Sequence, residues 1–307
     1  MSPIRLFCLI VASICLYAPF CTSLTPALPS KRMCAIRGGA ALPLAAVKAP
    51  PAIYEAVAAA GQKKASNSVD DIFKLGVISG AQIGLGAFLA VSIGGNCPGL
   101  ASANPGLQKL VMGAFGLPMG LLMTLVTGAE LATGNFMLVA AAYREGMTSA
   151  RSLWKSWTVS FLGNFVGSLI VAFLAFHSQT LSNPSAAAVA VAKTSQTFVV
   201  TFVRGIICSY LVAIAVYMAA GAESLEGKLA AIFFPISGFV AMGMDHCIAN
   251  MFLIPLGMLR GAPITIADFL LKNLLPVTLG NIVGCAFCVS YGFGSAFGKK
   301  KQKGIAA

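Results

Sequence analysis

Long apolar runs, separated by short polar stretches, dominate the chain from about residue 70 to residue 297. A helix that crosses a bilayer needs about 20 consecutive apolar residues. Six runs reach that length, near residues 74–95, 108–142, 153–177, 196–221, 228–258 and 267–295. The second and fifth runs are too long for one simple crossing. Because both contain Gly-bearing polar interruptions, we predict that both are broken helices.

The two interruptions are imperfect copies of each other. In residues 128–136 and in residues 243–251, an acid stands two residues after a Gly, and an Asn stands five residues after the acid. The copies continue beyond these stretches. Lys155 precedes a Gly-Asn-Phe-Val-Gly sequence by eight residues, and Lys272 precedes a Gly-Asn-Ile-Val-Gly sequence by eight residues. The first three runs therefore match the last three. Because three is odd, the second copy crosses the membrane in the opposite direction.

These patterns predict an all-α polytopic membrane protein with six transmembrane helices, arranged as two inverted three-helix repeats at about residues 72–177 and 196–297. Composition agrees, since 58% of the residues are hydrophobic and 10% are charged, with a mean hydropathy of +0.86. Soluble domains carry about 25% charged residues. The net charge of +12 does not indicate nucleic-acid binding, because Lys and Arg flank the apolar runs and form no basic face with aromatics. Their distribution places both chain ends on one side of the membrane.

The first 69 residues resemble a targeting region. Residues 1–23 look like a signal peptide, with Arg5 before an apolar run and small residues at the cleavage position. Residues 24–69 are basic and contain no acid before Glu55, as in a transit peptide, and we expect them to be disordered. A two-part leader predicts the plastid inner envelope, where nitrite would be a suitable substrate. The alternative is a signal peptide and a disordered tail on a plasma-membrane protein. Residues 298–307 form a basic tail.

Other function classes lack their signatures in the sequence. Cys285 and Cys288 form a lone Cys-x-x-Cys pair without a second pair or a flanking His, so we predict no metal and no cofactor. The sequence contains no Gly-x-Ser-x-Gly or His-Glu-x-x-His motif, so we predict no enzyme activity. An aquaporin-like channel for small neutral solutes is the alternative function. Only Asn104-Pro105-Gly106 approaches the Asn-Pro-Ala tripeptide of such channels, and it has no counterpart in the second half.

Three motifs in order carry a family resemblance. Residues 126–134 resemble the first signature of the formate/nitrite transporter family, residues 243–252 resemble its central histidine motif, and residues 273–281 resemble its last-span motif. The resemblance covers about residues 70–297. It implies a homopentamer of aquaporin-like six-span protomers embedded in lipid. Each protomer would hold its own pore for small monovalent anions such as formate, nitrite, lactate and hydrosulfide.

A histidine inside a membrane span is a functional candidate, because an ionisable group there is costly unless it faces a cavity. His246 lies within the interruption of the fifth run. We predict that it donates a hydrogen bond or a proton to the anion, so that a neutral acid crosses the apolar centre in a proton-coupled step. The resemblance implies that Thr133 orients the imidazole. Half-helices that begin near Asn135 and Asn250 would direct their positive ends toward the anion.

The resemblance also implies the lining of the pore. Lys155 would add positive potential in one vestibule of the pore. Repeat symmetry alone suggests the same role for Lys272 in the other vestibule, and the alternative is that its side chain extends to the membrane surface. Ala132 stands where the family usually has a bulky residue, often Phe, and Ser209 stands where it usually has Asn, so the substrate stays open. The expected lining consists of one apolar ring of Leu117, Leu121 and Phe239, a second of Leu131 and Ala132, and the polar residues His246, Thr133, Lys155, Asn250 and Ser209.

Glu130 and Asp245 occupy equivalent positions in the two copies. Backbone at membrane depth needs hydrogen-bond partners. We therefore predict that these carboxylates accept hydrogen bonds from the N–H groups of the broken helices and, with Asn135, are structural. Proton relay is the alternative role for the two acids.

Overall fold

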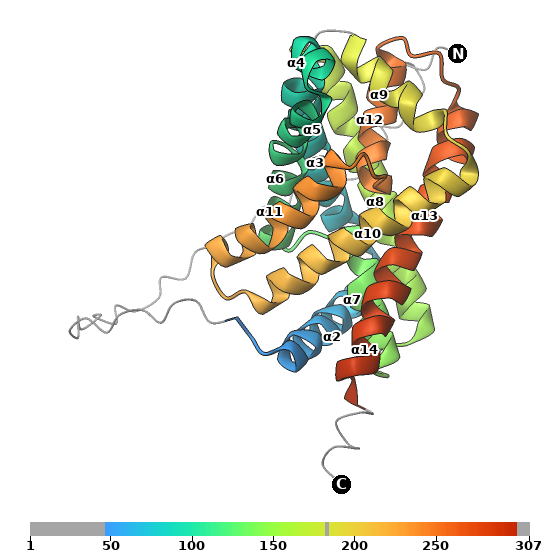
Figure 1. Cartoon of the computed structure of the whole chain (residues 1–307). Helices are drawn as coiled ribbons and strands as arrows, with labels where there is room; N and C mark the ends of the chain where they lie inside the picture. The colour runs from blue at the N-terminus through green and yellow to red at the C-terminus, as the bar shows by residue number, and fades with distance from the viewer. Residues whose placement is uncertain (1–46, 182–183, 300–307) are drawn as a thin grey trace, which may run out of the picture. The chain divides into compact units, whose positions relative to one another are not determined.

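The computed structural model describes residues 47–181 and 184–299, and the regular elements in these ranges are all helices (Figure 1). The expected signal peptide, the stretch from residue 24 to residue 46 and the chain from residue 300 onward lie outside the described residues. The targeting prediction therefore stays a prediction.

Six crossings follow one another in the predicted order. They are α3 (Val69–Ile93); α5 (Pro105–Ala114) with α6 (Leu117–Thr127) and α7 (Ala132–Arg144); α8 (Ala150–His177); α10 (Phe198–Gly221); α11 (Leu225–Ala241) with α12 (Cys247–Leu259); and η2 (Asp268–Leu274), α13 (Leu275–Ile282), η3 (Val283–Tyr291) and α14 (Gly292–Phe297). The short elements η1 (Gly94–Asn96), α4 (Pro98–Ala103) and α9 (Pro184–Thr194) lie between crossings. In the described part of the chain, five helices are long and apolar enough to cross a membrane, and α11 and α12 divide the remaining crossing. The second and fifth crossings are broken, which confirms the prediction.

A glycine ends the first half-helix at each break. Gly128 and Gly243 have φ angles of 75° and 72°, in the left-handed region that residues other than Gly rarely adopt. The second half-helices, α7 and α12, begin four residues later. Their first residues, Ala132 and Cys247, lie three residues before the starting points expected from the sequence. Each repeat therefore brings a buried helix N-terminus to the level of its break.

Each repeat begins one helix earlier than the sequence predicted. Residues 50–66, which we assigned to a disordered leader, form helix α2 (Pro50–Ser66), whose buried face includes Ile53, Tyr54 and Val57. The helical spacing of these residues lets α2 pack on α7. The helix was not predicted because the basic, acid-poor composition of the stretch resembles that of a transit peptide. In the same way, α9 precedes α10 and packs on α12. Each of these preceding helices covers the second half-helix of its own repeat.

Small residues bring the long helices of each repeat into backbone contact. α3 packs along α8, and α10 packs along α13. A Cβ atom at Gly80 would meet the backbone of Asn164, and one at Gly280 would meet the carbonyl of Phe202. Close approach of this kind is how small residues support helix packing in a membrane.

The sixth crossing is helical throughout, but it is not a regular α-helix over its whole length. Segments η2 and η3 have π-helical hydrogen bonding on either side of α13. Pro276, in the first turn of α13, has no N–H to donate, so the backbone hydrogen-bond ladder is already interrupted where η2 ends.

The described chain begins and ends at one end of the helix bundle. α2 and α14 lie together there, and α4 and α9 lie at the opposite end (Figure 1). We call these ends the α2 side and the α9 side. Glu145 joins the elements of the α2 side: its carboxylate accepts from the Tyr54 hydroxyl at 2.9 Å, the Arg144 guanidinium at 2.6 Å and the Lys299 backbone N–H at 3.1 Å. Burial raises the pKa of Glu145, but these hydrogen bonds outweigh burial and hold the pKa below its usual value.

Candidate functional site

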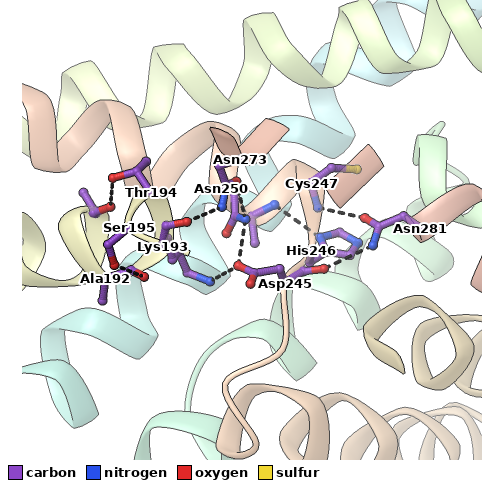
Figure 2. Close-up of polar contacts among 12 residues, drawn as sticks. Ala192, Lys193, Thr194, Ser195, Asp245, His246, Cys247, Asn250, Asn273 and Asn281 are labelled. Atoms are coloured by element: carbon purple, nitrogen blue, oxygen red, sulfur yellow. Dashed lines mark hydrogen bonds and ion pairs between the residues drawn. The ribbon is translucent and has the colours of Figure 1, made fainter. Parts of the chain in front are cut away.

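A single asparagine of the sixth crossing holds the break of the fifth. Figure 2 shows the Asn281 side chain beside Asp245 and Cys247. Its Oδ1 atom accepts from the Cys247 backbone N–H at 2.9 Å, and its Nδ2 atom donates to the carbonyls of Gly205 at 2.9 Å and Asp245 at 3.1 Å. All three bonds are buried. The asparagine thus supplies the partners that interrupted backbone requires at membrane depth.

Asn164 makes the same set of bonds in the first repeat. Its Oδ1 atom accepts from the Ala132 backbone N–H at 2.8 Å, and its Nδ2 atom donates to the carbonyls of Gly76 at 2.8 Å and Glu130 at 2.9 Å. This corrects the role that we predicted for the two acids. The broken backbone is held by the amide side chains, which can both donate and accept, whereas an ionised carboxylate can only accept.

The Asp245 carboxylate pairs with a lysine that precedes the fourth crossing. Lys193 Nζ lies 2.7 Å from Asp245 Oδ1, and Asn250 Nδ2 donates to the same oxygen at 3.1 Å (Figure 2). The Asp245 side chain is 2% exposed. Asn250 also donates to Asn273 Oδ1 at 2.8 Å. A buried carboxylate needs such partners, because burying an unpaired charge is expensive.

The Glu130 carboxylate has the equivalent partners in the first repeat. Lys64 Nζ lies 3.1 Å from Glu130 Oε1, and the side-chain amides of Asn67 and Asn135 donate to Glu130 at 3.0 Å and 2.7 Å. Sequence reasoning assigned Lys64 and Lys193 only to membrane flanks and missed both pairs. A signal was present: Lys64 stands twelve residues before Gly76, and Lys193 stands twelve residues before the equivalent Gly205.

His246 lies directly before α12, where its side chain caps the helix. Nδ1 accepts from the Ala249 backbone N–H at 3.2 Å, and Nε2 lies 3.0 Å from the Thr133 hydroxyl, which comes from the other repeat. An imidazole whose Nδ1 accepts carries its proton on Nε2 when neutral, so Nε2–H is the donor to Thr133. His246 is 3% exposed. The two breaks therefore meet at a neutral histidine and a threonine.

A cavity of about 320 Å³ reaches His246 from the α9 side. Its walls include Lys193, Asp245 and Asn250, and apolar residues of α5, α6, α9 and α11. Beyond it lies a space of about 10 Å³, and one water molecule needs at least about 10–15 Å³. This constriction is lined by Ile83, Leu117, Leu121, Val212, Ile236, Phe239 and His246. The three residues expected in the first ring therefore lie together against the histidine, and the Phe239 ring is centred 6.0 Å from the imidazole.

The remaining predicted residues take different positions. Leu131 and Ala132 are buried beside Thr133 at the start of α7, outside the two cavities described above. Ser209 is also buried outside them, near Gly284 of η3, and its hydroxyl has no hydrogen-bond partner among the described residues. Lys155 donates to the Asn67 carbonyl at 2.7 Å on the α2 side.

The symmetry-based role of Lys272 has no support from its surroundings. The Lys272 side chain is 61% exposed and pairs with Asp268 at 2.7 Å, one turn away on the same helix. The Cys-x-x-Cys pair is also divided, since Cys285 is buried and Cys288 is exposed.

Known proteins resemble the chain over most of its length. The sequence profile of the formate/nitrite transporter family matches residues 51–293. A probable formate transporter of Methanothermobacter thermautotrophicus is 37% identical over 264 residues, which cover 79% of this chain and 94% of that protein. The formate channel FocA of Haemophilus influenzae is 35% identical over 213 residues, which cover 62% of this chain and 74% of that protein.

Solved structures resemble the fold as well. A structure described as an FNT family ion channel has a TM-score of 0.73 and 30% identity, covering 80% of this chain and 98% of that chain. A pentameric formate channel with formate bound has a TM-score of 0.62 and 28% identity, covering 81% of this chain and 99% of that chain. With the inverted repeats, these neighbours show an aquaporin-like protomer fold.

Proposed function

The chain belongs to the formate/nitrite transporter family, whose members are membrane transporters and channels and not enzymes, and on this premise we propose that it conducts small monovalent anions through a pore centred on His246. The observation that carries the proposal is the contact between His246 and Thr133 at the inner end of the α9-side cavity. The Thr133 hydroxyl accepts from His246 Nε2–H and keeps its own proton free, so it offers a hydrogen-bond donor where a desolvated anion would most need one.

Electrostatics around this contact favour an anion. The half-helices α7 and α12 begin at Ala132 and Cys247, so the positive ends of both helix dipoles lie beside the pair. Lys193 lines the cavity that leads to the histidine. An approaching formate or nitrite ion would therefore exchange water for fixed positive potential before it reached the constriction.

Crossing the constriction requires the charge to be removed. A bare anion among Leu117, Leu121 and Phe239 faces a desolvation cost of at least several kcal/mol, and the neutral acid avoids most of it. Nδ1 of His246 accepts from the Ala249 N–H, so the neutral ring has no second proton to give. We therefore favour hydrogen-bond donation to the anion, by the Thr133 hydroxyl and by Nε2–H once the anion replaces Thr133 as its acceptor, over direct proton transfer from the ring. In this mechanism, a proton that enters with the anion neutralises it at the histidine.

The alternative, an aquaporin-like channel for neutral solutes, is less well supported. Its nearest motif, Asn104-Pro105-Gly106, lies at the exposed start of α5, where the Asn104 side chain caps the helix. Neither helix break contains it. A neutral-solute pore would also gain little from the buried Lys193–Asp245 and Lys64–Glu130 pairs beside the two breaks.

Reconstitution of the purified protein in liposomes tests the proposal. Uptake of formate and nitrite should follow an inward proton gradient, and His246→Phe should abolish it, because Phe keeps the ring volume and removes the donor. His177→Phe is the matched control. His177 is the other histidine of the chain and lies at the end of α8 against Phe173 and Phe176. Uptake that is unchanged in His246→Phe would remove the histidine from the mechanism.

Assembly and location complete the proposal. The pentameric formate channel among the structural neighbours and exposed apolar residues such as Val199, Phe234 and Leu271 support a homopentamer in lipid, which native mass spectrometry would test. The leader-like sequence supports a plastid inner envelope, with nitrite as the substrate. A fluorescent fusion of residues 1–60 that labels the cell surface would contradict that location.

A further inference from the structure

The α9-side cavity carries more positive charge than the ion pair at its base requires. Lys109, Lys193 and Arg204 line it, against one acid, Asp245. Lys193 is paired with that acid, and Lys109 is exposed. Arg204 is half-buried, and among the described residues its guanidinium takes part in no hydrogen bond, ion pair or ring contact. An uncompensated arginine in the wall of a membrane cavity is a candidate for a functional residue.

Arg204 lies on the path to the histidine. It is the seventh residue of α10, about 9 Å from the start of the helix at 1.5 Å per residue. The carbonyl of the next residue, Gly205, accepts a hydrogen bond from Asn281 Nδ2, which also donates to the Asp245 carbonyl at the break. Arg204 therefore lies near the level of the break. Arg204 and Val212 are eight residues apart, which places them on one face of α10. Arg204 lines the wide cavity, and Val212 lines the constriction at His246.

The other repeat has no charge at the corresponding position. Lys64 and Gly76 correspond to Lys193 and Gly205 through their pairs with the acids and with the asparagines. The residue before Gly76 is Leu75, whose counterpart before Gly205 is Arg204. The fold that the two repeats share therefore does not require an arginine at this position, and its charge acts at one entrance of the pore only.

We propose that Arg204 captures planar anions with two oxygen atoms, namely carboxylates and nitrite, and selects them over anions that offer a single acceptor atom. The inference rests on the proposed anion transport. A guanidinium presents parallel N–H donors that match two oxygens at once, whereas an ammonium acts as a point charge. Formate and nitrite would use both donors, and hydrosulfide would use only the charge.

Two variants separate geometry from charge. Arg204→Lys keeps the charge and removes the fork, and Arg204→Gln removes both. Arg151→Gln is the matched control, because Arg151 is exposed at the start of α8 outside the cavities described above. Each full-length protein is reconstituted in liposomes. Stopped-flow fluorescence then gives the half-saturating concentration and the maximal rate for formate and for hydrosulfide.

Loss of a bidentate contact should raise the half-saturating formate concentration about tenfold in Arg204→Lys, with a change below about twofold for hydrosulfide. Arg204→Gln should raise both values, and the maximal rates and the Arg151→Gln protein should stay at the wild-type level. Equal shifts for the two anions in Arg204→Lys, or no shift in either variant, would overturn the assignment. Absence of uptake by the wild-type protein would instead overturn the proposed function. Size-exclusion chromatography checks that each variant is folded. If Arg204→Gln does not fold, Arg204→Lys, which retains the charge, still tests the proposal.

Discussion

Replacing Asn281 with Ala should loosen the break that carries His246. The substitution removes three buried hydrogen bonds, those to the Cys247 N–H and to the carbonyls of Gly205 and Asp245. Side-chain hydrogen bonds between membrane helices contribute about 0.6 kcal/mol on average and about 1.7 kcal/mol at most. Three bonds therefore give about 2–5 kcal/mol. At about 2–4 °C per kcal/mol, the melting temperature should decrease by roughly 4–20 °C.

Thermal unfolding of the detergent-solubilised protein, followed by fluorescence-detected size exclusion, measures this decrease. Asn164→Ala should match it, because Asn164 makes the equivalent bonds in the first repeat. Asn104→Ala is the control: it deletes the same side chain from an exposed helix cap and should cost about 1 kcal/mol. If Asn281→Ala were no more destabilising than Asn104→Ala, the amide would not hold the break, and our account of the backbone at mid-membrane would be wrong.

Three further outcomes follow from the structure. Thr133→Val keeps the side-chain volume and removes the hydroxyl that contacts His246 Nε2. We expect the rate of formate uptake to fall about tenfold, which corresponds to about 1.4 kcal/mol. An unchanged rate would show that Thr133 takes no part in transport. Ala132→Phe adds an aromatic ring at the start of α7, where Ala132 is fully buried. In the same assay it should slow lactate uptake more than formate uptake. Equal rates for the two anions in both the wild type and the variant would contradict the predicted ring of Leu131 and Ala132. The pKa of Glu145 is lower in the folded protein, so its stabilisation is present above the unfolded pKa and is lost as the pH falls through the folded value. Between pH 7 and pH 3 the unfolding temperature should therefore decrease more in the wild type than in Glu145→Gln. If the two proteins showed parallel curves of unfolding temperature against pH, the pKa of Glu145 would not be lowered by folding.

Much of the fold was accessible from local patterns. Run lengths predicted the crossings, and Gly128 and Gly243 marked the two breaks because a left-handed residue favours Gly wherever it occurs. Helix α2 was missed because its apolar face is short and its composition resembles a leader. The π-helical segments of the sixth crossing were missed as well, because helix pitch depends on packing and not only on the residues of one segment.

The sequence by itself determined the breaks and the position of His246, because each is recognised from a short stretch of chain, and the inverted repeats, because two such stretches resemble each other. The tertiary structure decided which groups serve them. Asn281 binds residues 34, 36 and 76 positions away, Lys193 reaches Asp245 across 52 positions, and Thr133 meets His246 across 113. No periodicity specifies such contacts. In a medium without water, a buried polar group takes its partner from whichever helix packs beside it.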